Sequence, residues 1–316
     1  MQNRIQKENL NSGQGFFFTI EDSLAKLQTA FQEAEIVKTG IFGKALLLDG
    51  FTQLTERWEE RYHEPLVHPA MLAHPEPRRV LVLGGGDGGT LREVLKHKTV
   101  EHVDFAELDP EVVAFCKEYL PKVHKGSFDD KRVRHCYGDA RAFVRAAKAE
   151  YDVVIMDMTD PEGPARFLYT REFFKLVKKV LNNNNGIFAM HMESPAARPL
   201  AFACIKATLL SVFSAVDTAL AFVPMYSSLW AYGFAYDKAG PAVGPAAGPA
   251  AGPAAMSQAL LEARIEERML SAPSFACSKM WPALFAPDPI TAEAEKDPMV
   301  RIISDSEPDF PDTFEG

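Results

Sequence analysis

A glycine-rich turn between two apolar runs constrains the fold of this chain more than any other feature. Residues 80–83 are V-L-V-L and predict a short buried strand, and the glycines that follow lead into a helix predicted over residues 91–98. A second apolar run, residues 100–106, ends on Glu107 and Asp109. A strand, glycine loop, helix, strand and acid within about 30 residues form one unit of a parallel nucleotide-binding sheet.

The glycine turn carries a carboxylate. Gly84, Gly86 and Gly89 fit the G-x-G-x-x-G pattern that lets a backbone approach a nucleotide, but this pattern alone is not specific. Asp87 lies inside the turn, where a fixed negative charge would repel a pyrophosphate and attract a cation. We therefore expect a positively charged nucleoside without phosphates, such as an adenosyl sulfonium compound, and the same charge disfavours a nicotinamide dehydrogenase. A plain glycine turn with a solvated aspartate is the alternative.

Composition and charge limit the class of protein and its partners. With 316 residues, 47% of them hydrophobic, the chain can bury the core of one large domain and a small one. The net charge of −9 disfavours nucleic acid as a partner and favours a polycationic small substrate. Four cysteines without paired spacing argue against a zinc site or disulfide framework, and with a polar start they predict a cytoplasmic protein. The longest apolar region, residues 200–224, is interrupted by Lys206 and Asp217, so we expect no membrane span.

The order of predicted strands and helices defines the domains. Short β-type runs separated by turns predict a small antiparallel domain in residues 1–75. In residues 76–288 strands alternate with helices, which predicts an α/β fold with a doubly wound, mostly parallel, Rossmann-like sheet of the methyltransferase type. The Gly-Pro-Ala repeats within residues 239–255 predict a disordered surface loop, and the acidic tail of residues 289–316 is expected to be poorly ordered.

Acidic residues follow four successive predicted strands. They are Asp87, then Glu107 with Asp109, then Asp139, then Asp157 with Asp160. Ligands of an open parallel sheet bind outside the carboxyl ends of its strands, so these acids together predict a binding site. Glu107 suits both ribose hydroxyls, and Asp139 suits the exocyclic amine of adenine. For each acid taken alone, a solvated loop position or a helix cap is the alternative.

A turn between two carboxylates, D-M-T-D-P-E-G-P-A, predicts the reactive part of the site. Asp157 and Asp160 can divide the work, with one accepting a proton and the other holding a positive charge. A turn that caps the next helix is the alternative. Tyr62 and His63 precede the first strand of the glycine-turn unit and could reach its loop, although a Tyr-His pair is more often structural.

These motifs, in this order and spacing, resemble the polyamine aminopropyltransferases, the spermidine synthase family. The similarity covers residues 32–275 and includes L-L-L-D-G-F-T-Q-L-T-E-R, Y-H-E, H-P-x-P, G-G-G-D-G-G-T-L-R-E-V-L-K-H, E-L-D, G-D-A and D-M-T-D-P-E-G-P-A. Members of that family move an aminopropyl group from decarboxylated S-adenosylmethionine to an amine and release methylthioadenosine, without a metal or a permanently bound cofactor. The resemblance therefore implies a polyamine substrate and a homodimer or homotetramer.

The resemblance also implies roles for site residues. The residues that it places around the nucleoside are Gln32, Gly84, Gly86, Asp87, Glu107, Asp139, Ala140 and Pro164. Asp87 would hold the aminopropyl ammonium, in agreement with the charge argument above. Asp157 would accept the proton. The residues that would grip the acceptor amine are Tyr62, His63, Asp160 and Tyr226, and of these Tyr62 and Asp160 would take part in catalysis.

Several positions depart from typical spermidine synthases and bear on the acceptor. Trp58 stands where an aspartate is usual, and Met158 with Thr159 replaces the usual small pair. The segments V-P-M-Y-S-S-L-W and H-P-A-M-L-A-H-P are similar to the thermospermine synthases, whereas D-P-E-G-P-A and M-E-S-P are similar to ordinary spermidine synthases. We expect spermidine as the acceptor, giving thermospermine, with putrescine, giving spermidine, close behind. An S-adenosylmethionine-dependent methyltransferase and a non-catalytic nucleoside-binding homologue are the alternatives.

Overall fold

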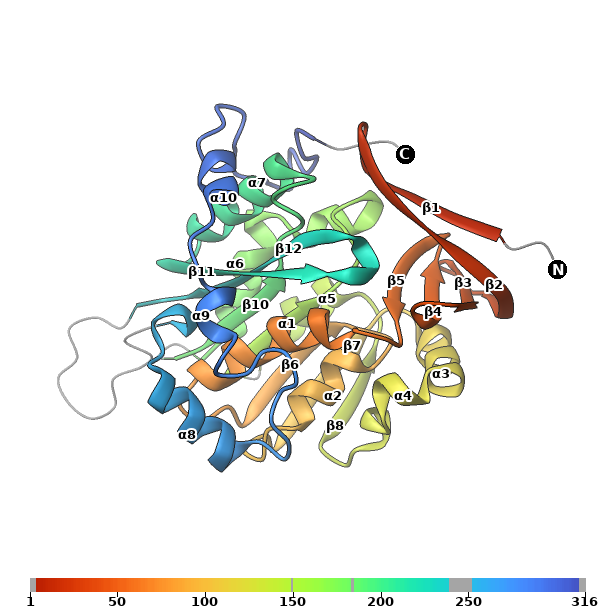
Figure 1. Cartoon of the computed structure of the whole chain (residues 1–316). Coiled ribbons are helices and arrows are strands. Elements are labelled where there is room, and N and C mark those ends of the chain that lie inside the picture. Colours follow the sequence, from red (N-terminus) through yellow and green to blue (C-terminus); the bar gives the residue numbers. More distant parts are fainter. Residues whose placement is uncertain (1–3, 149, 183–184, 239–251, 313–316) are drawn as a thin grey trace.

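Two β-sheets that lie next to each other organise the chain (Figure 1). The computed structural model describes residues 4–148, 150–182, 185–238 and 252–312. The first sheet is antiparallel, and its strands follow one another in chain order: β1 (Arg4–Asn11), β2 (Gln14–Gln28), β3 (Glu33–Thr39), β4 (Gly43–Leu48) and β5 (Phe51–Thr55).

The second sheet has seven strands in the order β11-β12-β10-β9-β6-β7-β8. They are β6 (Arg79–Gly84), β7 (His102–Glu107), β8 (Val133–Tyr137), β9 (Val153–Asp157), β10 (Ile187–His191), β11 (Ala215–Val223) and β12 (Ser228–Tyr236). Neighbours from β10 to β8 run parallel, whereas β12 and β11 join antiparallel at one edge. The predicted α/β class with a doubly wound, mostly parallel sheet is therefore confirmed.

Helices cover both faces of the seven-stranded sheet. The helices are α1 (Glu60–Ala73), α2 (Gly89–Leu95), α3 (Pro110–Tyr119), α4 (Pro121–His124), α5 (Ala140–Ala146), α6 (Arg171–Val180), α7 (Pro199–Leu210), α8 (Gln258–Arg268), α9 (Trp281–Leu284) and α10 (Pro289–Ala294). Along β6, Val80 and Val82 join the core shared with α1 and α2, while Leu81 and Leu83 join the core shared with α5, α6 and α7. Successive side chains of a strand point to opposite faces, so an unbroken apolar run builds both cores.

A third core fixes the five-stranded sheet against helices α3 and α4. Ile36 and Leu46 of that sheet pack with Phe115 and Leu120 in and after helix α3. The predicted domain boundary at residue 75 differs from this packing, because α1 contacts α2, β10 and β11 and so lies on the seven-stranded sheet. The antiparallel sheet ends with β5 at Thr55.

Residues 289–312 of the tail, which was expected to be poorly ordered, are packed instead. Ile303 is fully buried and Phe310 is 4% exposed in the core shared with α6 and α7, and helix α10 packs on α7. Most of the Gly-Pro-Ala segment, residues 239–251, lies outside the described residues, but 252–255 are ordered, contrary to prediction. Pro253 is buried, and its carbonyl accepts a 3.0 Å hydrogen bond from Trp281 Nε1. Apolar and ring side chains thus anchor segments whose average composition predicts disorder.

Within these ranges, no helix combines the length and apolar character that a membrane crossing requires.

Candidate active site

The glycine turn packs against the carboxyl end of strand β9. The strand register pairs Gly84 with Asp157, and Gly84 has a φ of 76°, in the left-handed region that favours glycine. A Cβ atom at Gly84 would overlap the carbonyl oxygen of Asp157, and one at Gly85 would lie 2.9 Å from Asp157 Oδ2. The turn therefore needs glycine at both positions, because it runs in contact with the predicted base.

Asp157 is a buried carboxylate with two hydroxyl donors. Tyr62 donates a 2.8 Å hydrogen bond to Oδ1, and Thr90 at the start of α2 donates a 2.7 Å bond to Oδ2. Burial and then the negative charge of Asp87 raise the pKa of Asp157 above its ordinary value, against the opposing effects of His63 and the two hydroxyls. A carboxylate with a raised pKa that is held in one orientation is suited to accept a proton near neutral pH.

Asp87 faces His63 across the start of helix α2. The Oδ1 atom of Asp87 accepts a 2.7 Å hydrogen bond from the Gly89 amide and lies 3.4 Å from His63 Nε2, while His63 Nδ1 lies 2.6 Å from Glu59. Burial acts to lower the pKa of His63, but Asp87 and Glu59 raise it well above the ordinary value. Burial likewise acts to raise the pKa of Asp87, yet His63 lowers it overall. His63, predicted to grip the amine, thus contacts the acid that was predicted to hold the donor.

Glu107 at the end of β7 lies beside the glycine turn. A Cβ atom at Gly86 would lie 3.3 Å from Glu107 Oε2, and Oε1 accepts a 3.0 Å bond from the Asp109 amide. Burial raises the pKa of Glu107 to about 7. Asp109 caps helix α3 and lies 3.4 Å from Gln32 Nε2, so it ties the five-stranded sheet, with Gln32, to this edge.

The residues predicted to contact adenine lie on the next two loops. Asp139 is exposed and caps helix α5, accepting a 2.6 Å hydrogen bond from the Ala142 amide. The sequence left open that this acid is a helix cap, and the structure shows that it makes this interaction. Ala140 follows it and is buried. Pro164 lies in the 3-10 turn Gly163–Leu168 of the loop after β9. Strand ends bring Glu107, Asp139 and Asp157 to one edge of the sheet, as the sequence predicts.

On the acceptor side, aromatic rings connect the base to the five-stranded sheet. The Tyr62 and Tyr226 rings meet edge to face at 6.0 Å, and the Tyr226 hydroxyl donates a 2.9 Å bond to the Gln53 carbonyl in β5. Asp160 is exposed in the loop after β9. Trp58 has a positive φ of 66° and its ring packs edge to face on Phe42 at 6.0 Å.

Sequence reasoning missed Glu193 as a site residue. Glu193 follows β10, is 1% exposed and has a φ of 66°. Its carboxylate forms a cluster with Asp160 and His191 in which the oxygen and nitrogen atoms lie within 4.8 Å of one another. Burial and then the charge of Asp160 raise its pKa well above the ordinary value. It follows a fifth strand, so the rule that identified the acids after the other four strands would have found it.

The histidine next to Asp87 does not fit a metal centre. His63, Asp87 and Asp157 bring ligand-type atoms within 4.8 Å of one another. A metal needs a neutral imidazole with a free lone pair. Both ring nitrogens of His63 face carboxylates, and the pKa of His63 is raised, so the protonated form is favoured.

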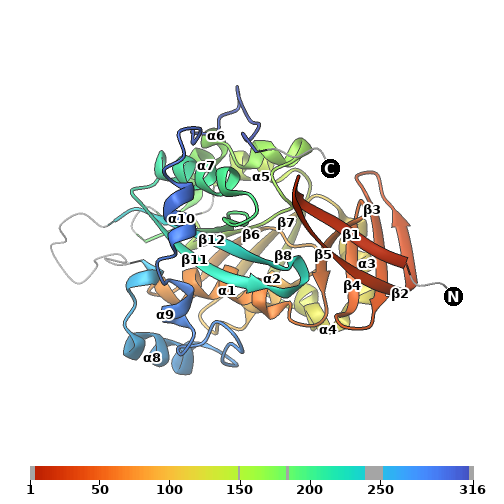
Figure 2. The ribbon, with the colours of Figure 1, turned by 45° about the horizontal axis from the view of Figure 1, so that its top comes forward.

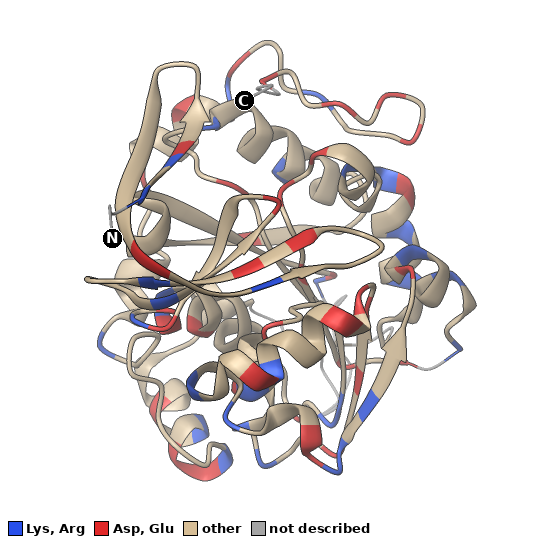
Figure 3. Cartoon of the chain, turned by 90° about the vertical axis from the view of Figure 1, so that its right-hand side faces the viewer, with Lys and Arg blue, Asp and Glu red and all other residues tan. Residues whose placement is uncertain are grey.

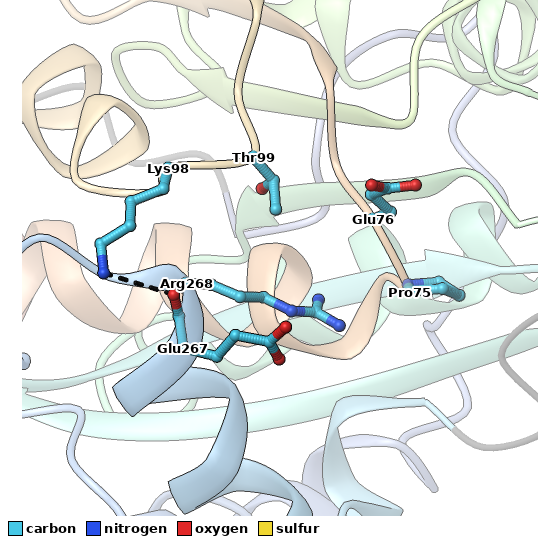
Figure 4. Close-up of a pocket in the computed structure, with 6 residues that line it drawn as sticks. All are labelled: Pro75, Glu76, Lys98, Thr99, Glu267 and Arg268. Atoms are coloured by element: carbon cyan, nitrogen blue, oxygen red, sulfur yellow. Dashed lines mark hydrogen bonds between the residues drawn. The ribbon is translucent and has the colours of Figure 1, made fainter.

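A surface cavity of about 410 Å³ is lined by six residues that are not among those predicted for the site (Figure 4). The residues that line it are Pro75, Glu76, Lys98, Thr99, Glu267 and Arg268. They precede strands β6 and β7 or end helix α8, which places the cavity at the amino ends of the parallel strands. Ligands of such sheets bind at the carboxyl ends, so the cavity is not the predicted site.

Charges of both signs are mixed along the elements on the side of the molecule that faces the viewer in Figure 3. The chain has 43 acidic and 34 basic residues, and in this view the acidic residues do not form one patch. The negative charge that a cationic ligand would meet is the local charge at the strand ends.

Comparisons with known proteins agree with this geometry. A family model described as spermine/spermidine synthase domain matches residues 59–243, and one described as spermidine synthase tetramerisation domain matches residues 5–56. The polyamine aminopropyltransferase of Nitrosomonas europaea is 41% identical over 224 residues, which cover 71% of this chain and 69% of that protein. The polyamine aminopropyltransferase of Thermococcus onnurineus is 48% identical over 172 residues, which cover 54% of this chain and 61% of that protein.

The fold of the whole chain is similar to a solved enzyme structure. A crystal structure of a spermidine synthase in complex with the transition-state analogue AdoDATO superposes with a TM-score of 0.81 at 29% identity, covering 93% of this chain and 96% of that chain. The family model, the relatives and the fold all lead to one conclusion: this chain belongs to the spermine/spermidine synthase family.

Proposed function

We propose that this chain transfers an aminopropyl group from decarboxylated S-adenosylmethionine to a polyamine and releases methylthioadenosine. The observation that carries the proposal is the setting of Asp157, a buried carboxylate with a raised pKa that lies in contact with the glycine turn. The relatives named as polyamine aminopropyltransferases and the similar enzyme bound to a transition-state analogue support the same reaction.

Proton removal is the protein's part in the bond-forming step. An ammonium cannot attack carbon, so Asp157 accepts one proton from the acceptor amine and frees its lone pair. The nitrogen then bonds to the propyl carbon while the carbon-sulfur bond breaks, and the bonding electrons go to sulfur. The sulfonium leaves as a neutral thioether, so the leaving group needs no acid. Tyr62 and Thr90 hold the Asp157 carboxylate in one orientation for this transfer.

The donor site follows from the acids around the glycine turn. Asp87 carries the negative charge next to which the aminopropyl ammonium binds, and His63 keeps that carboxylate ionised. Glu107 accepts hydrogen bonds from the ribose hydroxyls, with Gln32 on the opposite side. Asp139, Ala140 and Pro164 surround the adenine.

A triamine acceptor such as spermidine is favoured over putrescine by the acids beyond the base. Asp160 and Glu193 cluster near the loop after β9, and Glu8 of strand β1 lies within electrostatic reach of Asp160. Burial raises the pKa of Glu8, with the charge of Asp160 adding to the effect. A row of carboxylates beyond Asp157 matches the several amines of a longer cation.

Product analysis tests the reaction and the acceptor together. The protein is incubated with decarboxylated S-adenosylmethionine and, in separate reactions, putrescine, spermidine or agmatine, and the amines are separated by chromatography against spermidine, spermine and thermospermine standards. We expect thermospermine from spermidine as the main product. A protein that alkylates none of the amines contradicts the proposal, and methylation by S-adenosylmethionine in the same assay would favour the methyltransferase alternative.

A matched pair of variants tests the acceptor length. Glu8→Gln should raise the KM for spermidine several-fold more than the KM for putrescine. Glu21→Gln is the control, because Glu21 lies on the adjacent strand in an exposed ion pair with Lys38. Equal KM changes for both amines would contradict a role of Glu8 in binding the longer acceptor.

Assembly through the five-stranded sheet is a further part of the proposal. Large apolar side chains are exposed on that sheet, with Ile5 at 55%, Phe17 at 72% and Phe51 at 55%. Exposed apolar groups gathered on one domain favour association. Light scattering should give a homo-oligomer that Phe17→Ser weakens, whereas a monomeric wild-type protein would contradict it.

A further inference from the structure

Residues 301–312, which we call the clamp segment, cross the carboxyl edge of the seven-stranded sheet. They lie outside the region that the family model matches. Figure 2 shows the last coloured stretch passing from α10 over α7 and α6 toward α5. The amide of Ile303 donates a 2.9 Å bond to Thr208 Oγ1 in α7, and its carbonyl accepts a 2.9 Å bond from the Arg171 amide at the start of α6. The segment is thus fixed to two helices before it reaches the loops of the site.

Asp305 joins the start of helix α5, which follows β8, to the end of the loop after β9. Its carboxylate accepts a bidentate pair of bonds from Arg141 and a 2.7 Å bond from Thr170 Oγ1. Arg141 also donates a 3.1 Å bond to the carbonyl of Phe167. Arg141 directly follows Ala140, and Phe167 lies in the same 3-10 turn as Pro164. One carboxylate therefore sets the spacing of the two loops predicted to enclose adenine.

Phe310 supports the part of the loop that follows the base. Its ring meets the ring of Tyr169 edge to face at 6.4 Å, and Tyr169 is fully buried. The Tyr169 hydroxyl donates to the Thr159 carbonyl at 2.8 Å and lies 2.8 Å from His191 Nε2. Thr159 stands between Asp157 and Asp160, the two predicted carboxylates of the loop. Phe310 therefore contacts the backbone of this loop indirectly, through Tyr169.

Asp309 and Asp312 complete the contacts. Asp309 Oδ1 lies 2.8 Å from Arg166 in the loop after β9. Asp312 Oδ2 accepts 3.0 Å bonds from the amides of Leu200 and Ala201 at the start of α7, which caps that helix. The clamp segment thus contacts the connections after three strands: the first turn of α5 after β8, the loop after β9, and the first turn of α7 after β10.

We propose that the clamp segment holds these three connections in their ligand-binding shape and that Asp305 is a positioning residue for the nucleoside site, acting through Arg141 and Thr170. The proposal rests on the function proposed above. If the segment only covered the core, loss of Asp305 would weaken nucleoside binding no more than loss of any other contact made by the tail. A positioning role predicts instead that loss of Asp305 weakens nucleoside binding specifically.

A matched pair of substitutions distinguishes the two roles. Asp305→Ala removes the ion pair with Arg141, and Glu295→Ala removes the ion pair that Glu295 makes with Lys206 between the tail and α7. The two acids are similarly exposed, at 39% and 37%, so the general cost of each substitution should be similar. Only Asp305 contacts the loops of the site.

Binding and kinetics provide the first measurement. In the full-length chain, Asp305→Ala should raise the KM for the donor and the Kd for methylthioadenosine about fivefold or more, with kcat changed less. Glu295→Ala should leave both within twofold of wild type. The double variant with Arg141→Ala and Asp305→Ala should bind methylthioadenosine no more weakly than either single variant. A donor KM and Kd that stay within twofold in Asp305→Ala overturn the positioning role.

Hydrogen exchange provides a measurement that needs no ligand. Amides of residues 158–170 should exchange several-fold faster in Asp305→Ala than in wild type or Glu295→Ala. Unchanged protection overturns the clamp even if the enzyme is active. Loss of protection in a protein that transfers no aminopropyl group would instead support the clamp while rejecting the proposed function, so the two failures are distinguishable.

Discussion

The phenol of Tyr62 donates a 2.8 Å hydrogen bond to Oδ1 of Asp157 and so joins helix α1 to the end of strand β9. The bond stabilises the ionised carboxylate and opposes the rise in pKa that burial of Asp157 causes. Together with the bond from Thr90 to Oδ2, it holds the carboxylate in one orientation. Helix α1 therefore contacts the proposed base as well as the core.

Loss of that hydroxyl should change both rate and pH dependence. We expect Tyr62→Phe to lower kcat about tenfold, on the order of one lost hydrogen bond to a charged group. The pKa of Asp157 should rise further, so the acid limb of the kcat/KM profile should move to higher pH. Tyr232→Phe is the control, because its buried ring lies 5.9 Å from that of Tyr62 while its hydroxyl donates to the Arg61 carbonyl. An unshifted acid limb in Tyr62→Phe would contradict this account.

Removal of the base should separate binding from chemistry. Asp157→Asn keeps a side-chain oxygen that can accept the Tyr62 or Thr90 bond but cannot take a proton. We expect turnover to fall by roughly 10² to 10⁴, the usual contribution of general base catalysis. Methylthioadenosine binding, measured by calorimetry, should stay within a few-fold of wild type. Turnover close to wild type would exclude Asp157 as the base.

Glu107 should make stability depend on pH. Burial raises its pKa in the folded protein to about 7, from an ordinary value of 4.5. A raised carboxyl pKa gives a stability contribution that is present below pH 4.5 and is lost as the pH rises through 7, at most about 3 kcal/mol. Glu107→Gln should therefore match wild type in urea unfolding at pH 4 and exceed it at pH 8, while binding methylthioadenosine more weakly.

Glu111→Gln is the control for that measurement, since Glu111 is an exposed acid on the next helix. It should leave the free energy of unfolding unchanged at both pH values. A Glu107→Gln variant that is less stable than wild type at pH 8 would show that the ionised carboxylate stabilises the fold.

Removal of divalent metals should leave the activity intact. His63 is held between Glu59 and Asp87 with a raised pKa, which favours the protonated ring over a metal ligand. Dialysis against EDTA should change neither kcat nor the donor KM by more than a factor of two. Activity that falls on chelation and returns with added Zn²⁺ or Mg²⁺ would contradict the predicted absence of a metal.

Local sequence signals were sufficient for the sheet and for most of the acids at its edge. The apolar runs of β6, β7 and β9 are fully buried strands, and parallel pairing necessarily gathers their carboxyl ends. The charge of Asp87 inside a glycine turn was enough to predict a cation in place of a phosphate. The strands are confirmed because each depends on neighbours within one strand-loop-helix unit, whereas the cation at Asp87 stays a prediction.

Contacts between distant segments could not be predicted in the same way. Tyr62 and Asp157 are 95 residues apart, and Arg141 and Asp305 are 164 apart, so no periodicity or spacing connects either pair. The acidic composition of residues 289–316 hid Ile303 and Phe310, two apolar side chains that anchor the segment. Average polarity is a weak predictor of order where a few buried groups decide the packing.

The pairing of Gly84 with Asp157 in the β6 and β9 register has a consequence for how this enzyme can change. Backbone hydrogen bonds, which every sequence makes alike, set the separation between the donor turn and the base. The acceptor side is built from side chains on loops and on another sheet. If the proposed roles are right, we expect substitutions there to alter which amine is used while the distance between the glycine turn and Asp157 stays constant.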